Sequence, residues 1–589
     1  MTKTEKLLLW QQRLSENESA FVSEYEKMDE REDIYLGSKD YKRSLVSNDK
    51  SGSNVHIRNI VSELIETQVS SDLPGPKVTA KRACDEEKAK LIENMLRNEM
   101  DRLPLECIND IMERTVLIQG GGAFFLEWDT APSAGDFGNI SITPVHPKQL
   151  IVQNGVYSDI SDMDYFILKL PQTRENIKRK YGIELEDEEG NSEDTDETAT
   201  QYVAYYKNDD GTVGMFSWVG DTVICDYENY QSRNYRICND CGEILPSADN
   251  KNSDGRCPFC GGKNFENVNS QSEEKWVLDP DGTYKKVRIP FYEPKAFPIV
   301  LQKNVSVFGK LYGESDVDKI SDQQNTANRI ETKIIDKLLK SGSYITLPDE
   351  ASIRFDSEDM KVIRPGSAAN KNLIDVFDLQ GNIEQDLVYL NQVYEEARQI
   401  IGITDSFQGR NDTTALSGRA KEFSASQSVG RLMSKRVMKE AAYAKLFELI
   451  FKFKLAFEDE KRYVVSRDDK GNSKYDVFDR YDFLEQDENG NYYWNDAFLF
   501  SCDTSSALAA NREKMWQETR MNLQSGAFGD PSDIDTLILF WSKMDALHYP
   551  GASETKRYLE KRLFENINGP GEAEIENPAN ENGISAGEA

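Results

Sequence analysis

Four cysteines near the middle of the chain have the spacing of a zinc ribbon. Cys238 and Cys241 form one Cys-x-x-Cys pair, and Cys257 and Cys260 form a second pair after fifteen intervening residues. A structural zinc site takes four sulfur or nitrogen ligands in a closed tetrahedron, and each pair places two thiolates on one side of the ion. A closed site leaves no coordination position for water or substrate. The four residues therefore predict one structural Zn2+ ion per chain and no metal catalysis.

Two disulfides or ordinary buried thiols are the alternatives to a zinc site. A glycine follows the second cysteine of each pair, as expected for tight turns that need a residue with positive φ. Unpaired cysteines are typical of a reducing compartment, where disulfides are rare, and they favour the metal over the disulfides. The cysteines without paired spacing are Cys84, Cys107, Cys225 and Cys502.

The charge of the chain limits how it contacts nucleic acids. Its 589 residues include 71 basic and 103 acidic residues, which gives a formal net charge of −32. Such a surface cannot neutralise many phosphates, so stable nucleic-acid binding is not expected, but an acidic wall suits DNA that only passes by.

No apolar stretch approaches the ~20 residues of a spanning helix, so we expect a soluble, intracellular chain without a membrane partner. The length predicts several domains.

The elements that position the cysteines are mixed, which predicts an α+β fold. Residues 1–118 have helical periodicity. Runs of apolar and aromatic residues bounded by Gly, Pro and Asp predict strands at 123–128, 140–142, 165–170, 202–206, 213–227 and 276–292. The cysteine ribbon is therefore predicted to be an insertion between strands of one domain. An acidic stretch at 184–197 is predicted to be a solvated loop.

Two helices with a small strand-rich module between them follow the mixed region. The predicted helices cover 313–340 and 383–401, and the module covers 343–376. The first helix has only a thin apolar stripe, so we expect it either to pack on sister copies through polar contacts or to span between domains in solvent. The polar residues that interrupt the stripe are Gln323, Gln324, Asn325 and Asn328.

The longest helical pattern begins near Thr414, after a loop, and ends at about Phe457. Gly418 and Gly430 are weak points where such a helix can bend. Between Arg410 and Lys454, ten Lys or Arg residues stand against four Asp or Glu residues, a net charge of +6 that leaves −38 for the rest of the chain. Strands at 462–466 and 497–501 and helices at 505–523, 532–547 and 553–566 are predicted downstream.

No residue pattern indicates catalysis. The three histidines, His56, His146 and His548, lie outside any nucleophile-base or metal-ligand pattern. Gly120–Gly122 precedes a predicted strand, whereas a phosphate-binding loop opens a helix and ends in Gly-Lys-Ser or Gly-Lys-Thr. The sequence predicts a protein that is not an enzyme.

The order of elements over about residues 5–566 resembles the portal protein family of tailed bacteriophages, here with a four-cysteine ribbon inserted. Short local runs in their order carry the resemblance: Asn59–Val61 with Leu73–Pro76, Gly313–Ser315, Ile401–Ile403 and Leu416–Ala420. Members of this family are the subunits of a head-tail connector ring. The resemblance implies an α+β wing, a two-helix stem, a small β-rich clip, a long kinked tunnel helix and a helical crown.

The resemblance also assigns each part of this sequence to a portal domain. The implied parts are a wing at 1–312 with the ribbon inserted at 232–268, stem helices at 313–341 and 383–402, a clip at 342–382, a tunnel loop at 403–417, the long helix and wing return strands at 418–504, a crown at 505–566 and a disordered acidic tail at 567–589.

The function implied by the resemblance is structural. Portal subunits form the channel through which double-stranded DNA is packaged and ejected, and they dock terminase first and head-tail connector or adaptor proteins afterwards. The implied assembly is a homo-oligomeric ring of twelve that contacts the major capsid protein at the portal vertex of the virion, after assembly in the host bacterial cytoplasm.

Near the tunnel loop, Arg410, Arg419 and Lys421 are candidate contacts to DNA phosphates, with ion pairs to an adjacent subunit as the alternative. A second hypothesis is a zinc-ribbon nucleic-acid-binding or assembly factor without a portal role. That hypothesis predicts a basic surface beside the cysteines, but Asp240, Glu243, Asp249 and Asp254 lie there with only Lys251 and Arg256.

Overall fold

The computed structural model describes residues 2–38, 41, 56–70, 72–129, 138–155, 157–181, 183, 198–230, 234–238, 240–241, 244–246, 260–262, 265–269, 272–278, 284–346, 352–355, 361–364, 375–379, 381–403, 418–458, 460–467, 473–487, 490–503, 512–546, 549 and 551–568. These residues belong to two compact units. Unit 1 comprises Met1–Arg462 and Phe478–Cys502, and unit 2 comprises Tyr463–Val477 and Asp503–Ala589. Within the described ranges, no helix combines the length and the apolar character that crossing a membrane requires.

The N-terminal part of unit 1 is helical, as predicted. Its helices are α1 (Lys3–Leu36), α3 (Ile60–Gln68), α4 (Glu86–Arg102) and α5 (Leu105–Gln119), with the short α6 (Arg174–Tyr181) further on. A capping box between Thr2 and Glu5 starts α1, and Gly37 in the left-handed region ends it. The sequence prediction missed β1 (Gly75–Ala80), which lies between α3 and α4.

Two antiparallel sheets form the strand-rich part of unit 1. One has the order β4 (Leu150–Val152), β5 (Tyr165–Thr173), β6 (Thr198–Lys207), β7 (Val213–Val219) and β8 (Thr222–Tyr227), and the other has the order β14 (Ile299–Lys303), β2 (Gly121–Asp129) and β3 (Asn139–Val145). Side chains alternate between the faces of β5: Phe166 and Leu168 join the core with β2 and β14, and Ile167 packs on the opposite face. Leu7 and Trp10 of α1 cover that opposite face.

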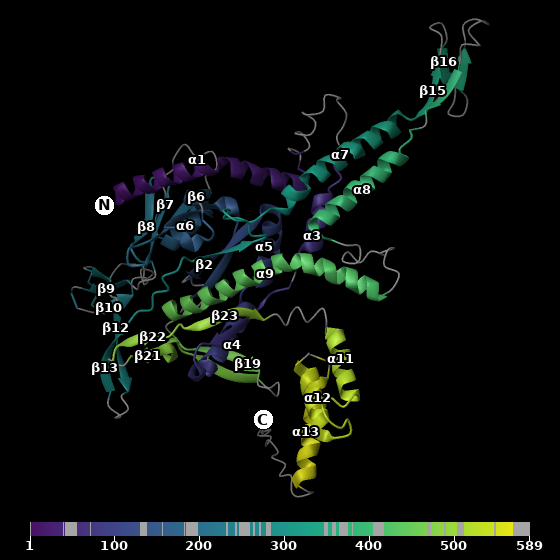
Figure 1. Cartoon of the computed structure of the whole chain (residues 1–589). Helices are drawn as coiled ribbons and strands as arrows, with labels where there is room; N and C mark the ends of the chain where they lie inside the picture. The colour runs from purple at the N-terminus through teal and green to yellow at the C-terminus, as the bar shows by residue number, and fades with distance from the viewer. Residues whose placement is uncertain are drawn as a thin grey trace, which may run out of the picture. The chain divides into compact units, whose positions relative to one another are not determined.

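The predicted helix, module and helix appear in the predicted order. The helices α7 (Asp316–Lys340) and α8 (Glu384–Ile401) run side by side and lead to the strand module at one end (Figure 1). In the module, β15 (Gly342–Thr346) pairs with β18 (Asp375–Leu379), and β16 (Ser352–Phe355) pairs with β17 (Lys361–Arg364). Ion pairs from Lys333 and Lys337 of α7 to Asp386 of α8 link the helices near that end.

The prediction for the polar residues of α7 was wrong for Gln324 and Asn328. Neither residue is left for contact with a sister copy or with solvent, because both side chains are fully buried within the chain. The Gln324 Oε1 atom accepts hydrogen bonds from the amide nitrogens of Ile60 and Val61 at 2.9 and 3.1 Å. These amides begin α3 and have no partner inside their own helix, so the polar stripe of α7 satisfies the start of a neighbouring helix.

The longest helix, α9 (Gly418–Phe457), is continuous through Gly430. Its C-terminal half lies in an aromatic core of unit 1, where the ring of Phe451 contacts those of Phe483 and Phe498. Strands β21 (Leu484–Gln486), β22 (Tyr492–Trp494) and β23 (Phe498–Asp503) follow, and β23 pairs with β1.

Unit 2 contains the hairpin of β19 (Arg462–Arg467) and β20 (Ser473–Phe478) and the helices α11 (Arg512–Gln524), α12 (Ile534–Ala546) and α13 (Ala552–Asn568). The helices pack around Phe540, Met544 and Ala552. The predictions for the acidic loop at 184–197, the loop at 404–411 and the tail at 567–589 fall wholly or almost wholly outside the described residues.

Candidate metal centre and basic helix

Three short strands position the clustered cysteines. They are β9 (Asn234–Cys238), β10 (Ile244–Pro246) and β11 (Phe265–Asn269), and they form an antiparallel sheet with β9 in the centre. Cys238 is the last residue of β9 and lies opposite Phe265 of β11. Cys241 lies in the turn after β9, and Cys260 lies in a turn before β11. The sheet therefore brings together cysteines that are 22 positions apart.

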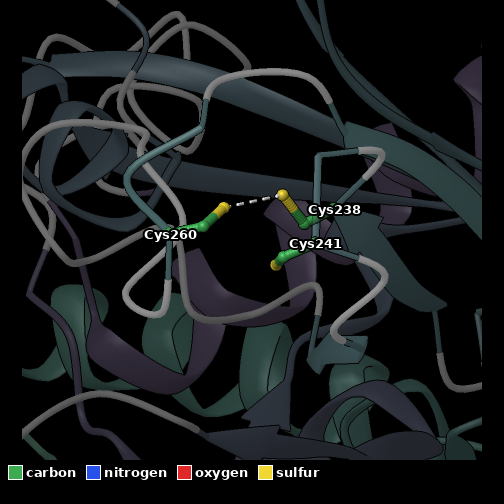
Figure 2. A group of neighbouring side chains, drawn as sticks. All are labelled: Cys238, Cys241 and Cys260. Carbon is green, nitrogen blue, oxygen red and sulfur yellow. Dashed lines mark hydrogen bonds between the residues drawn. The ribbon is translucent and has the colours of Figure 1, made fainter.

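The sulfur atoms of Cys238, Cys241 and Cys260 form one cluster (Figure 2). The Sγ atoms of Cys238 and Cys260 are 3.5 Å apart, and all three Sγ atoms lie within 4.8 Å of one another. Cys238 is buried, whereas Cys241 and Cys260 are exposed. None of the three is in a disulfide. Such spacing suits thiolates around one ion with Zn–S bonds of about 2.3 Å.

Two glycines shape the turn beside the cluster. Gly261 has a φ of 73°, the left-handed conformation predicted for the residue after the second cysteine. A Cβ atom on Gly262 would lie 2.0 Å from the Oδ2 atom of Asp240, so a larger residue here would require the exposed Asp240 side chain to move. The equivalent glycine of the first pair, Gly242, and the fourth predicted ligand, Cys257, lie outside the described residues.

The donor set distinguishes these cysteines from others in the chain. Cys502 is one of the scattered thiols; burial raises its pKa to about 12, and it is not part of a cluster of potential ligands within the described residues. Cys84 and Cys107 are exposed and are not part of a cluster of potential ligands within the described residues. Three neighbouring thiols can hold a metal ion, and sulfur donors favour zinc or another soft ion.

The strand that leaves the ribbon is tied to a distant part of unit 1. The strands β12 (Ser272–Leu278) and β13 (Tyr284–Pro290) pair with each other, and β13 packs against β22. The indole Nε1 atom of Trp494 donates a 2.6 Å hydrogen bond to the carbonyl oxygen of Pro290. The hydroxyl of Tyr292 donates to the Oδ2 atom of Asp496 at 2.9 Å. Side chains from β22 and the turn after it thus fix the chain segment that follows the cysteine insertion.

The positive charge of α9 is largely neutralised inside the chain. Six of its nine Lys and Arg residues pair with carboxylates of unit 1: Lys435 with Asp316, Arg436 with Glu440, Lys439 with Glu113, Lys445 with Asp159, Lys452 with Glu448 and Lys454 with Glu99 and Glu458. Four of these pairs, with Asp316, Glu113, Asp159 and Glu99, join α9 to remote parts of the chain, so local spacing does not predict them. These six residues are therefore not free for DNA phosphates.

The three predicted channel residues remain predictions. Arg410 lies outside the described residues, and the structure gives the backbone of Arg419 and Lys421 within α9 but no description of their side chains.

Large apolar side chains are exposed near the strand-module end of the α7–α8 pair. They are Leu338 and Leu339 at the end of α7 and Leu387, Val388 and Tyr389 in the first turns of α8. Leu339 and Val388 are 78% and 64% exposed. Neighbouring exposed apolar side chains of this kind mark an interaction surface more often than an ordinary solvated one.

Comparison with known families decides what this order of elements means. The model of the phage P22-like portal protein family matches residues 56–582. The chain belongs to this family. No curated protein matches the sequence. The match covers unit 1 from α3 onwards and the helices of unit 2, so membership rests on nearly the whole chain.

Family membership confirms the predicted resemblance and the α+β portal fold, and it supports a portal role over that of a zinc-ribbon factor without one. Portal proteins are structural components of the phage, and the family accounts for the absence of catalytic patterns in the sequence. The cysteine ribbon lies inside the matched range, but the match itself does not assign a metal to it.

Proposed function

We propose that this chain is the subunit of a closed portal ring whose channel conducts double-stranded DNA into the capsid during packaging and out of it during ejection. The family match over residues 56–582 carries this proposal. In the same proposal the ring has twelve subunits and sits at the portal vertex of the virion. It docks terminase during packaging and head-tail connector or adaptor proteins afterwards, and it contacts the major capsid protein.

The elements of the chain supply candidates for the parts of a portal. We assign residues 1–312 and the return strands within 418–504 to the wing, α7 and α8 to the stem, and the β15–β18 module to the clip. Residues 403–417 are the proposed tunnel loop, and α11–α13 are the proposed crown. The exposed apolar side chains at the end of α7 and the start of α8 support a ring, because a neighbouring subunit in a cyclic assembly would cover them.

The ring proposal predicts a change of assembly when that apolar surface becomes charged. We expect the full-length protein to form rings, and a ring of twelve 67.1 kDa chains has a mass of about 0.8 MDa. The double substitution Leu387→Asp and Tyr389→Asp should shift most of the protein to monomers, because it places carboxylates in an apolar contact. Electron microscopy and mass photometry measure both states.

Leu8→Asp is a matched control, because Leu8 is an exposed apolar residue of α1 outside the α7–α8 pair. It should leave the rings intact. The double variant should keep the unfolding temperature of the wild-type monomer, since the two replaced side chains are exposed. A wild-type protein that stays monomeric at micromolar concentration in several salt conditions would contradict the ring.

The channel proposal predicts a packaging defect when the basic residues near the tunnel loop are reversed. Arg410→Glu and Arg419→Glu should leave ring assembly intact but lower the fraction of DNA-filled particles by roughly tenfold, because phosphates then meet like charge. Lys421→Glu should behave in the same way. Lys445→Gln is the control, since Lys445 is already paired with Asp159. Genome content of purified virions is the measurement, and normal content in the arginine variants would remove their proposed role.

We further infer that Cys238, Cys241, Cys257 and Cys260 bind one structural zinc ion per chain. The clustered sulfur atoms of the three described cysteines support this assignment, and Cys257 completes the set of four by its spacing in the sequence. The ion would stabilise the ribbon in the proposed wing. A site of four thiolates has no position for a reacting ligand, so its role is structural.

A further inference from the structure

The helix α9 is attached to the rest of unit 1 in two chemically different ways. From Leu446 to Ala456 its buried side chains are almost all apolar, and they include Phe447, Phe451 and Phe453. From Met433 to Ala441, by contrast, no described apolar side chain is buried. Burial of a Leu or Phe side chain holds a helix in place because its exposure to water is unfavourable. The earlier segment needs another form of attachment.

Polar contacts supply that attachment. Lys435, Lys439 and Tyr443 lie four residues apart and therefore share one face of α9. We call Lys435, Lys439 and their partners the polar seam, and Tyr443, whose ring is fully buried against Phe124, lies at its anchored end. The three contacts are the ion pair of Lys435 with Asp316, the ion pair of Lys439 with Glu113 at 3.3 Å, and the 3.0 Å hydrogen bond from the hydroxyl of Tyr443 to the Oδ1 atom of Asn109.

The contacts between α5 and α9 have the order expected for two antiparallel helices. Asn109 and Glu113 are four residues apart on α5, so they also share a face, and the later residue of α5 pairs with the earlier residue of α9. Asp316 continues the series from the first turn of α7. Lys439 and Asp316 are more than nine-tenths buried. These charges are therefore held away from bulk water.

Further polar groups complete the seam. The Nζ atom of Lys435 donates to the Oε1 atom of Gln68 at 2.7 Å, and that of Lys439 donates to the carbonyl oxygen of Asp72 at 2.8 Å. The Nδ2 atom of Asn304 donates to the Oδ1 atom of Asp316 at 3.0 Å. Every one of these groups can exchange its partner for water when the surfaces separate, whereas an apolar contact has no such replacement.

We propose that the polar seam is a releasable attachment, at which Met433–Ala441 separates from α5 and α7 while Ala442–Ala456 stays anchored. The attraction within a buried ion pair roughly offsets the hydration that its members lose, so opening the pair is far less unfavourable than exposing an aromatic core. Gly430 lies just before the segment and weakens the helix there. The chain thus contains a hinge between a fixed and a detachable part of its longest helix.

Hydrogen exchange on the full-length protein tests this attachment. A detached helical segment of this length is marginally stable in water, so its amides exchange when it separates. Amides of Met433–Ala441 should exchange at least roughly tenfold faster than those of Leu446–Ala456, because the seam opens without global unfolding. Mass spectrometry of peptides from the two segments measures the difference. Equal exchange of both segments, through global unfolding only, would overturn the proposal.

Two variants separate a releasable seam from a merely mobile helix. Lys439→Met leaves Glu113 buried without its cation and should raise exchange of the seam segment roughly 100-fold. The double variant Lys439→Met with Glu113→Leu replaces the ion pair by an apolar contact and should bring exchange below that of the wild type. The double variant keeps the test valid if the single variant fails to fold. Unchanged exchange in the double variant would contradict the proposal.

Lys452→Met is the matched control on the same helix. Lys452 pairs with Glu448 within α9, four residues away, and this pair does not join the helix to another element. Its loss should leave exchange of both segments unchanged. A general effect of removing a lysine from α9 would instead change exchange in this control as well, and would remove the seam as the explanation.

The protonation of the two lysines gives the attachment a pH dependence. Burial lowers the pKa of Lys435 against the opposing effect of Asp316, and burial lowers the pKa of Lys439 against that of Glu113. The other charged groups that act on them are Lys319 and Glu113 for Lys435, and Asp72 and Arg436 for Lys439.

Since the open form has ordinary lysine pKa values, it binds more protons than the attached form at pH values between the lowered pKa and the ordinary one near 10.5. The attached form should therefore gain relative stability as the pH rises through this window. Exchange of the seam segment, corrected for the intrinsic rate at each pH, should fall relative to that of Leu446–Ala456. A relative rise would contradict the proposed role of the lysines.

The consequence for the channel rests on the proposed function. The detachable segment lies between the anchored half of α9 and the proposed tunnel loop at 403–417, so its release would let that loop change position without disturbing the wing. Hydrogen exchange on the purified chain tests whether the seam opens. Genome content of virions with the double variant tests whether that opening is needed for DNA packaging. A seam that opens while packaging is normal would leave the attachment standing and remove its role in the channel.

Discussion

Replacing Cys238 with serine is expected to abolish zinc binding, so that the metal content falls from one ion per chain to near zero. Cys238 is the buried member of the cluster, and its place at the end of β9 aligns it with the other sulfur atoms. A serine hydroxyl is not among the ligands that zinc prefers. Structural zinc contributes on the order of 10 kcal/mol to the folding of small ribbons. Strands β9–β11 should therefore lose protection from hydrogen exchange in this variant.

Elemental analysis of full-length protein purified under reducing conditions measures the metal content. Cys84→Ser is the matched control, because Cys84 is exposed and lies outside the cluster, and it should leave the metal content unchanged. The thiols of the cluster should also be shielded from alkylation until a chelator is added. Wild-type protein with almost no metal would rule out the zinc site while leaving the portal fold and the seam untouched.

Lys454→Met is expected to cause a large loss of folding stability. Lys454 is almost fully buried and pairs with Glu99 and Glu458 at 2.8 Å each, and the Glu458 side chain is fully buried. Loss of the ammonium group leaves two carboxylates without this cation. We expect a destabilisation of about 3 kcal/mol, the lower end for a broken buried pair, because Arg102 and Arg462 still pair with the carboxylates. For a unit of this size the unfolding temperature should fall by about 3 °C.

Calorimetry at fixed protein concentration measures this change, with Lys452→Met as the control. Lys452 and Glu448 are partly exposed, and loss of such a pair changes stability by less than ~1 kcal/mol. Adding Glu458→Gln to Lys454→Met should recover part of the loss, since it removes one of the stranded charges. Equal unfolding temperatures for Lys454→Met and the control would show that the buried network contributes little to stability.

Local sequence signals predicted many of the elements of this fold. The order of the helices and strand module between Gly313 and Phe457 followed from periodicity and from glycines at helix ends, because these are properties of neighbouring residues. Gly402, for example, ends α8 in the left-handed conformation. Short strands such as β1 and β4 were missed, since their few residues form a strand only through pairing with distant partners.

The candidate sites divide in the same way. The Cys-x-x-Cys spacing identified the sulfur cluster, because each pair acts through a turn of a few residues. The role of the lysines in α9 was not visible, although the four-residue spacing of Lys435, Lys439 and Tyr443 placed them on one face. Their partners are remote: Asn109 is 334 positions away from Tyr443. Only a folded chain brings such pairs together.

The cysteine spacing, the excess of acidic residues and the order of helices typical of a portal protein could all be read without a structure. These features depend on composition and on spacing over a few residues. The folded structure was needed to show which of the described charges of α9 are paired, and that the polar face of α7 satisfies the start of α3. Burial and pairing are set by long-range packing, and this packing makes Gln324 and Lys439 internal contacts.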